Sequence, residues 1–244
     1  MTTDPRALQK RIRALSNPRD AGFLQRFFKT GPGEYGEGDR FLGIRVPVTR
    51  RLIREYQGPA IPAARLLLTS RYHEERLLAL LLLVRAYPRA TPEAQAEIYR
   101  FYLANTRYIN NWDMVDCSAP QIVGRHLLKR DRRVLNRLAR SRNVWERRIA
   151  VLATQYFIRS GEFKPTLELA ERLLNDSHDL MHKAIGWMLR EVGHRDRAVL
   201  ESFLDRHAAR MPRTMLRYSI EKLPPRPRSR YMKARSLAPA HFTP

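Results

Sequence analysis

The stretch Tyr72–Leu80, with the sequence Tyr-His-Glu-Glu-Arg-Leu-Leu-Ala-Leu, aligns without a gap with Val144–Leu152, Val-Trp-Glu-Arg-Arg-Ile-Ala-Val-Leu. The two stretches lie 72 positions apart, which is two periods of 36 residues. Segments at Trp112 and Met181 fall about one period after each of them. A period of this length, built from helix pairs, is typical of a helical solenoid of the HEAT or armadillo kind.

The rest of the chain is also helical in pattern. From Val48 onward apolar residues recur at helical spacing, prolines open several segments, and no segment shows sustained period-2 alternation. We therefore predict an all-α fold, a right-handed helical solenoid of HEAT-like helix-pair repeats. In such a stack the second helices line the concave side, so residues one period apart are expected to meet along one basic groove.

Composition sets the predicted domain boundary. Residues 1–223 carry the helical pattern and are expected to form a single HEAT-like repeat domain. Residues 224–244 begin Pro-Pro-Arg-Pro-Arg-Ser-Arg and are rich in proline and basic residues. We interpret this last segment as an extended, partly mobile basic tail.

The charge balance indicates the class of partner. The 244 residues include 46 Lys and Arg against 24 Asp and Glu, a formal net charge of +22. Such a chain favours a polyanion, with nucleic acid ahead of an anionic membrane. The longest apolar run, Leu77–Val84, is far too short to span a bilayer. A single cysteine and an N-terminus without a signal pattern fit a reducing cytoplasm, in a bacterial cytosol or nucleoid.

Four residues form the strongest candidate site. Trp112 and Asp116 are four positions apart, so on a helix they share one face. Arg148 and Trp187 lie in the aligned helices of the following repeats, which lets all four converge in the groove. Two structural alternatives remain open at this point: the tryptophans are core residues, and Asp116 forms an inter-repeat salt bridge with Arg148.

Other chemistries find little support in the sequence. Cys117 has no His, Asn or second Cys at a helical spacing that would activate it, so we expect a small, buried, structural residue. No metal-ligand pair and no acidic cluster is present, so we expect no metal and no cofactor. The glycine-rich loop Thr30–Asp39 matches neither a phosphate-binding loop nor a dinucleotide fingerprint, and we interpret it as a surface turn.

Basic residues recur on the amphipathic helices and at their ends, which indicates a surface that follows a phosphate backbone. An aromatic residue at the edge of that surface could stack on bases. The candidates for contact with DNA are Lys29, Tyr35, Arg45, Arg147, Arg148, Arg190, Arg213 and Arg217.

Several blocks of this sequence resemble the DNA alkylation repair enzymes of the AlkD type. The resemblance runs in the family's order from about Phe27 to Leu223. The blocks that carry it are Phe27–Asp39, Phe41–Pro47, Ile109–Asp116, Trp145–Ala150, Lys183–Gly193 and Thr214–Leu223. The first helix and the tail contribute little to it.

This resemblance implies a function and the residues behind it. The family's catalytic aspartate falls on Asp116, its two active-site tryptophans on Trp112 and Trp187, and its backbone-contacting arginine on Arg148. The implied activity is that of a monofunctional DNA glycosylase of base excision repair. It would excise N3- and N7-alkylated purines from duplex DNA without flipping the base, as a monomer without metal or cofactor.

Two other functions are compatible with the same residues. One is a HEAT-like module that binds damaged or branched DNA without catalysis. The other is a solenoid scaffold for an acidic protein partner. Related family branches that bind DNA without excising bases lack part of the four-residue set, so its presence favours the enzyme.

Overall fold

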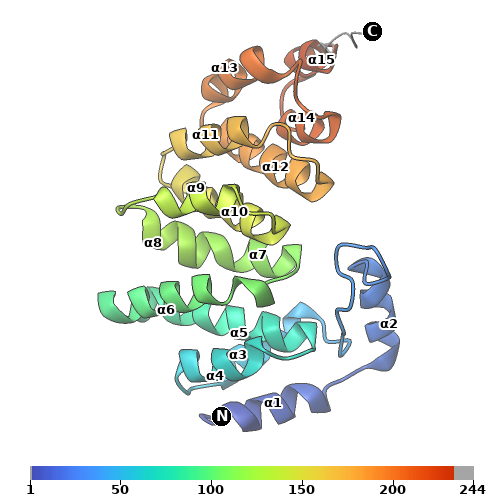
Figure 1. Ribbon diagram of the computed structural model, residues 1–244, viewed down its shortest axis with the longest axis vertical. Helices are drawn as coiled ribbons and strands as arrows, with labels where there is room; N and C mark the ends of the chain where they lie inside the picture. Colours follow the sequence, from blue (N-terminus) through green and yellow to red (C-terminus); the bar gives the residue numbers. More distant parts are fainter. Residues whose placement is uncertain (1, 234–244) are drawn as a thin grey trace. The chain divides into compact units, whose positions relative to one another are not determined.

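The computed structural model describes residues 2–233 of the chain, and the regular elements of these residues are helices (Figure 1). Within them the only β-type pairings are two isolated bridges, Thr2 with Tyr56 and Arg40 with Tyr72. The all-α prediction is therefore confirmed. None of the described helices is long and apolar enough to cross a membrane.

Contacts divide the chain into two compact units, one ending at His126 and the other beginning at Leu127. The first unit is built around α5, against which α3, α4 and α7 pack. Its elements are α1 (Pro5–Ala14), α2 (Pro18–Phe27), α3 (Val46–Glu55), α4 (Ala60–Leu68), α5 (His73–Ala86), the 3-10 turn η1 (Tyr87–Arg89), α6 (Pro92–Ala104), the 3-10 turn η2 (Thr106–Tyr108), α7 (Trp112–Ala119) and the π-helical turn η3 (Pro120–Gly124).

The short helix α8 (Arg125–Leu127) crosses the boundary between the units. In the second unit α10 packs on α9 and α11, and α12 packs on α10, α13 and α14. The elements are α9 (Arg133–Ala139), α10 (Val144–Arg159), α11 (Lys164–Arg172), α12 (Asp179–Arg195), α13 (Arg197–His207), α14 (Arg213–Ser219) and α15 (Pro225–Lys233).

The helices repeat as the sequence predicts. The helices α5, α7, α10, α12 and α14 begin at residues 73, 112, 144, 179 and 213, so their starts lie 32 to 39 residues apart. In the second unit α10, α12 and α14 pack one after another, and in the first unit α7 packs on α5. A helical repeat with a period near 36 residues is thus present within each unit.

The closest helix packing in the second unit depends on a glycine. A Cβ atom at Gly186 on α12 would lie 2.5 Å from the carbonyl oxygen of Met215 and 2.5 Å from the Cβ of Tyr218. Because Gly186 has no side chain, α14 approaches the backbone of α12 directly. This contact fixes the turn of α12 that carries Trp187.

The polar first turn of α5 holds the N-terminal segments of the first unit. The buried carboxylate of Glu74 accepts hydrogen bonds from the backbone N–H groups of Leu42, Gly43 and Ile44, at 2.9, 2.9 and 3.0 Å. The next residue, Glu75, accepts from Arg13 on α1 at 2.5 Å. Two neighbouring carboxylates of α5 therefore tie down the chain before α3 and the helix α1.

The segment after residue 223 departs from the prediction. Residues 225–233 form the helix α15 where an extended chain is expected, because the prolines lie in its first turn, where the missing N–H costs little. The buried Tyr231 anchors this helix, since its hydroxyl lies 2.8 Å from Asp205 and 3.3 Å from the carbonyl oxygen of Glu201. The remainder of the expected tail lies outside the described residues, and a single functional domain over 1–223 stays a prediction.

We predict that Glu74→Gln destabilises the protein by roughly 2–4 kcal/mol. The amide keeps the shape of the carboxylate but presents an NH2 group to backbone donors, which leaves a buried N–H without an acceptor. Urea unfolding followed by circular dichroism measures the loss. The exposed Glu168→Gln on α11 is the matched control and should stay within about 0.5 kcal/mol of the wild type; equal effects of the two changes would contradict the anchoring role of Glu74.

Candidate functional site

Helix α7 carries two of the candidate site residues, Trp112 and Asp116. It begins at Trp112, and the side-chain oxygen of Asn111 accepts from the backbone N–H of Trp112 at 2.8 Å. Trp112 and Asp116 are both half-buried, and their spacing of four places them on one face of the helix. The same-face pair expected from the sequence therefore lies in the first turns of a real helix.

Aromatic rings hold the indole of Trp112. The ring of Phe28 stacks on it with centroids 5.2 Å apart and an interplanar angle of 23°. Phe27 meets it edge-on at 6.1 Å and stacks in turn against Phe23 at 6.2 Å. Phe23 and Phe27 are more than half exposed, so the aromatic surface continues from Trp112 onto the outside of α2.

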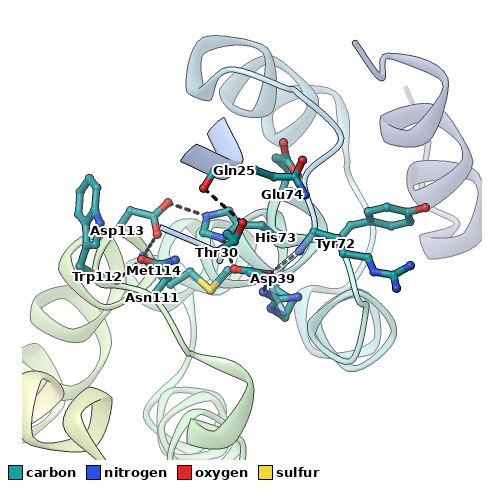
Figure 2. A network of polar contacts seen from close by, with 12 residues as sticks. Gln25, Thr30, Asp39, Tyr72, His73, Glu74, Asn111, Trp112, Asp113 and Met114 are labelled. Carbon is teal, nitrogen blue, oxygen red and sulfur yellow. Dashed lines mark hydrogen bonds and ion pairs between the residues drawn. The ribbon is translucent and has the colours of Figure 1, made fainter. Parts of the chain in front are cut away.

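A buried ionic network lies beneath this turn of α7 (Figure 2). The Nε2 atom of His73 is 2.8 Å from Asp113 on α7, and its Nδ1 atom is 2.9 Å from Asp39 at the end of the glycine-rich loop. Asp39 also pairs with Arg76 on α5. Asp113 in addition accepts from the backbone N–H of Met114 at 2.8 Å, so it both closes the first turn of α7 and reaches α5.

The geometry sets the charge of His73. Both ring nitrogens face carboxylates, which only accept hydrogen bonds when ionised, so both nitrogens must donate and the ring is an imidazolium. Burial lowers the pKa of His73, but the charge of Asp113 and the hydrogen bonds to Asp113 and Asp39 overcome this and raise the pKa to about 9. Burial also opposes ionisation of Asp39, yet the hydrogen bond and charge of His73 and the charge of Arg76 lower its pKa.

The helix widens one turn after Asp116. The residue four positions after Asp116 is Pro120, which has no N–H to donate to the carbonyl of Asp116, and the chain forms a π-helical turn from Pro120 to Gly124. Beside it, burial and the nearby Asp113 and Asp116 raise the pKa of Cys117. A thiol with a raised pKa is a poor nucleophile, in keeping with the structural role expected for Cys117.

The second unit presents Arg148 and Trp187. Arg148 on α10 is buried, and its Nη1 atom donates to the carbonyl oxygen of Leu180 on α12 at 2.7 Å. Trp187, on the same helix α12, is half-buried, and its indole N–H donates to Glu191 at 3.0 Å. The arginine thus fixes the helix that carries the second tryptophan.

The other candidates for DNA contact differ in how strongly the protein holds them. Arg147 is bound to Asp176 at 2.7 Å and to the carbonyl oxygen of Ser141 at 3.0 Å. Arg45 and Arg190 form ion pairs with Asp20 and Glu221 respectively. Four further candidates lie on the surface or near it: Lys29, Arg213 and Arg217 are exposed, and Tyr35 is half-buried.

The glycine-rich loop is a surface turn, as expected. Gly33 and Gly38 have positive φ values of 75° and 78°. The loop caps itself, because Glu34 accepts from the N–H of Gly31 and Glu37 from the N–H of Gly33, each at 2.9 Å. The loop leads into the buried Asp39, which links it to the network under α7.

Sequence reasoning missed Asp39, His73, Arg76 and the aromatic support of Phe28. The only signal for the network in the sequence was the run His73-Glu74-Glu75-Arg76. Four consecutive polar residues are unusual at the start of a helix whose following residues are almost all apolar. Apart from the contact of Arg76 with Ser70, their partners are 30 to 66 residues away, at separations that no local pattern reveals. The ring of His73 stacks on Phe41 at 4.4 Å, which further stabilises its positive charge.

The fold and the site define a helical-repeat protein with polar helix starts and a very basic sequence. The chain belongs to the DNA alkylation repair enzyme family, whose model matches residues 8–223. It is also similar to the solved structure of a predicted DNA alkylation repair enzyme from Enterococcus faecalis, with 17% identity and a TM-score of 0.68 over 85% of this chain and 96% of that one. At this identity the likeness supports the fold. No curated protein matches the chain.

Family membership confirms the resemblance inferred from the sequence blocks and supports a role in DNA repair. DNA is the corresponding partner, which agrees with the net charge of +22.

We predict that the protein loses stability as the pH rises from 6 to 9.5. The pKa of His73 is about 9 in the folded chain against 6.5 for an ordinary histidine, so its contribution is complete below about pH 6.5 and disappears as the pH passes about 9. The loss should be on the order of 2–3 kcal/mol. Urea unfolding at a series of pH values measures it.

The variant His73→Gln should remove most of this pH dependence. His126→Gln is the control, since His126 is another buried histidine of the first unit, stacked on Tyr99 and bonded to Tyr87. If wild type and His73→Gln lose stability equally over this range, His73 is not the titrating group.

Proposed function

We propose that this protein is a monofunctional DNA glycosylase of base excision repair that hydrolyses the N-glycosidic bond of cationic N3- and N7-alkylated purines in duplex DNA. The observation that carries the proposal is the pairing of Trp112 with Asp116 on one face of α7, in a chain of the DNA alkylation repair enzyme family. For Trp187 and Arg148, which lie on α12 and α10, we propose the roles that the resemblance implies, an active-site tryptophan and a backbone-contacting arginine.

The chemistry requires a carboxylate at the sugar. Alkylation at N3 or N7 makes the purine cationic and therefore a good leaving group. As the bond to C1′ breaks, positive charge builds on the deoxyribose. The Asp116 carboxylate would stabilise the positive charge that develops on the sugar in the transition state. It would also orient the attacking water. The bond between C1′ and the purine nitrogen breaks, and its electron pair leaves with the purine, which departs as a neutral base. The water oxygen bonds to C1′, and the proton that the water loses passes to the Asp116 carboxylate and then to solvent.

The tryptophans suit the same charge distribution. The faces of Trp112 and Trp187 carry negative quadrupoles, so they attract the polarised C–H groups of the sugar. Stacking of Phe28 on Trp112 and the hydrogen bond from Trp187 to Glu191 hold the two rings in place. Such rigid surfaces act on the backbone without receiving a flipped base, which is the mode that the resemblance implies.

The arginines would bind the phosphates. Arg148 would fix the register of the DNA backbone, and its bond to the Leu180 carbonyl orients its guanidinium. The exposed Lys29 and Arg217 add sequence-independent attraction. We further propose that the protein acts as a monomer in the cytoplasm, without metal or cofactor.

We predict that purified protein releases 7-methylguanine from methylated duplex DNA faster than spontaneous depurination, and that Asp116→Asn abolishes this excess. Binding to the same duplex should change by less than about threefold, because loss of an acid near DNA does not remove a phosphate contact. Base release is measured by chromatography and binding by fluorescence anisotropy. Asp131→Asn, on an exposed turn, is the control and should keep full activity.

Release of 7-methylguanine by the wild-type protein at the spontaneous rate would contradict the proposed glycosylase activity. Tight binding of damaged or branched DNA with no activity would then favour the non-catalytic module. Weak binding without preference for abasic or alkylated sites would favour the scaffold for an acidic partner. The three functions are therefore separated by one set of measurements.

Affinity for duplex DNA should fall steeply with salt, and Arg217→Gln should reduce the slope of log K against log[salt] by about one. The reason is that each lost phosphate contact releases roughly one counterion fewer. Anisotropy titrations between low and physiological salt measure the slope. Lys164→Gln, an exposed cation on α11 outside the candidate set, should leave it unchanged; an equal effect of both changes would show diffuse attraction without a defined surface.

A further inference from the structure

The network under α7 places two cations and two anions in alternation. Arg76 pairs with Asp39, Asp39 with His73, and His73 with Asp113, the last two contacts at 2.9 and 2.8 Å. All four side chains are buried or nearly so, with Asp113 the most exposed at 17%. Because isolated buried charges are strongly unfavourable, the alternation explains how the chain tolerates them.

Asp113, the last anion of this network, lies close to Asp116, the proposed catalytic acid, on α7. Asp113 and Asp116 are three positions apart on α7, a spacing that puts Cβ atoms about 5–6 Å apart on a helix. Two carboxylates at that separation oppose each other's ionisation. A mechanism that needs Asp116 negative therefore benefits when the charge of Asp113 is compensated.

We propose that His73 is a positioning residue for this site: it neutralises Asp113 and fixes the first turn of α7, so that Asp116 carries the negative charge that faces the sugar. The inference rests on the proposed glycosylase activity for its functional part. Its structural part, a His73 that is charged at neutral pH and bonded to two carboxylates, stands independently of that activity.

The titratable and charged groups near His73 and Asp116 come from several elements of the first unit. His73 faces Asp39 from the loop before α3 and Asp113 from α7, with Arg76 on its own helix and the rings of Phe28 and Phe41 against it. Asp116 has Asp113 and Cys117 beside it on α7, Tyr102 on α6 and, close to Cys117, Arg50 on α3. Burial raises the pKa of Tyr102 and that of Cys117, so both stay neutral at physiological pH.

Loss of the positive charge of His73 should shift the pH dependence of base release in one direction. In His73→Gln the negative charge of Asp113 is no longer compensated, and it disfavours ionisation of Asp116. The acid limb of the pH–rate profile should then move to higher pH, by roughly half to one unit. In the double variant His73→Gln/Asp113→Asn both charges are absent, and the limb should return to its wild-type position.

The rate experiment measures single-turnover release of 7-methylguanine from methylated duplex between pH 5 and 9, with the spontaneous release subtracted at each pH. The proteins are wild type, His73→Gln, the double variant and the control His126→Gln, whose profile should match the wild type. A uniform loss of rate in His73→Gln at every pH, with no return in the double variant, would show a purely structural role and overturn the inference.

A second measurement does not depend on activity. In an imidazolium the two ring nitrogens have similar 15N shifts, whereas in a neutral ring they differ widely. We expect 15N-labelled protein at pH 7.5 to show one histidine with both nitrogens protonated, and that signal to be missing from His73→Gln. A neutral His73 at this pH overturns the inference whatever the activity. Absence of base release by the wild type, with a charged His73, instead overturns the proposed function and the catalytic part of the inference.

Discussion

The organisation of the first unit depends on the buried charges in the first turn of α5. Four consecutive residues, His73 to Arg76, hold four different parts of the chain: α7, the segment 42–44, α1 and the end of the glycine-rich loop. Each buried ion costs several kcal/mol unless it is paired and hydrogen-bonded. The turn is therefore stable only when all of these segments are in place, which makes their arrangement cooperative.

The aligned turn of α10, in the second unit, also contains a buried charged residue that bonds to a neighbouring segment. Arg148 occupies the position of Arg76 in the repeat, and the two residues are 4% and 5% exposed. Arg76 donates to the carbonyl oxygen of Ser70, and Arg148 to that of Leu180. The helices α5 and α10 thus each bury a guanidinium in their first turns and use it to hold a neighbouring segment. Backbone carbonyls are suitable partners because a guanidinium has five donors in a rigid plane.

This design suits a site that must stabilise charge. Electrostatic stabilisation of a transition state requires dipoles and charges that are already oriented before reaction. In the first unit Trp112 is stacked on Phe28 and Asp113 is bonded to His73, so the groups beside the proposed acid on α7 have little freedom. The π-helical turn from Pro120 to Gly124 adds a local irregularity directly after α7, on the C-terminal side of Asp116.

The sequence by itself determined the helical class, the repeat period, the family and the same-face pair of Trp112 and Asp116. These follow from local spacing, because hydrophobic periodicity and helix geometry act over a few residues. Sequence patterns misjudged residues 225–233, where proline in the first turn is compatible with a helix that Tyr231 anchors to Asp205. Only the tertiary structure decided that His73 is charged and that it connects Asp39 to Asp113. A charge state depends on which groups surround a side chain in space, and those groups come from positions far apart in the chain.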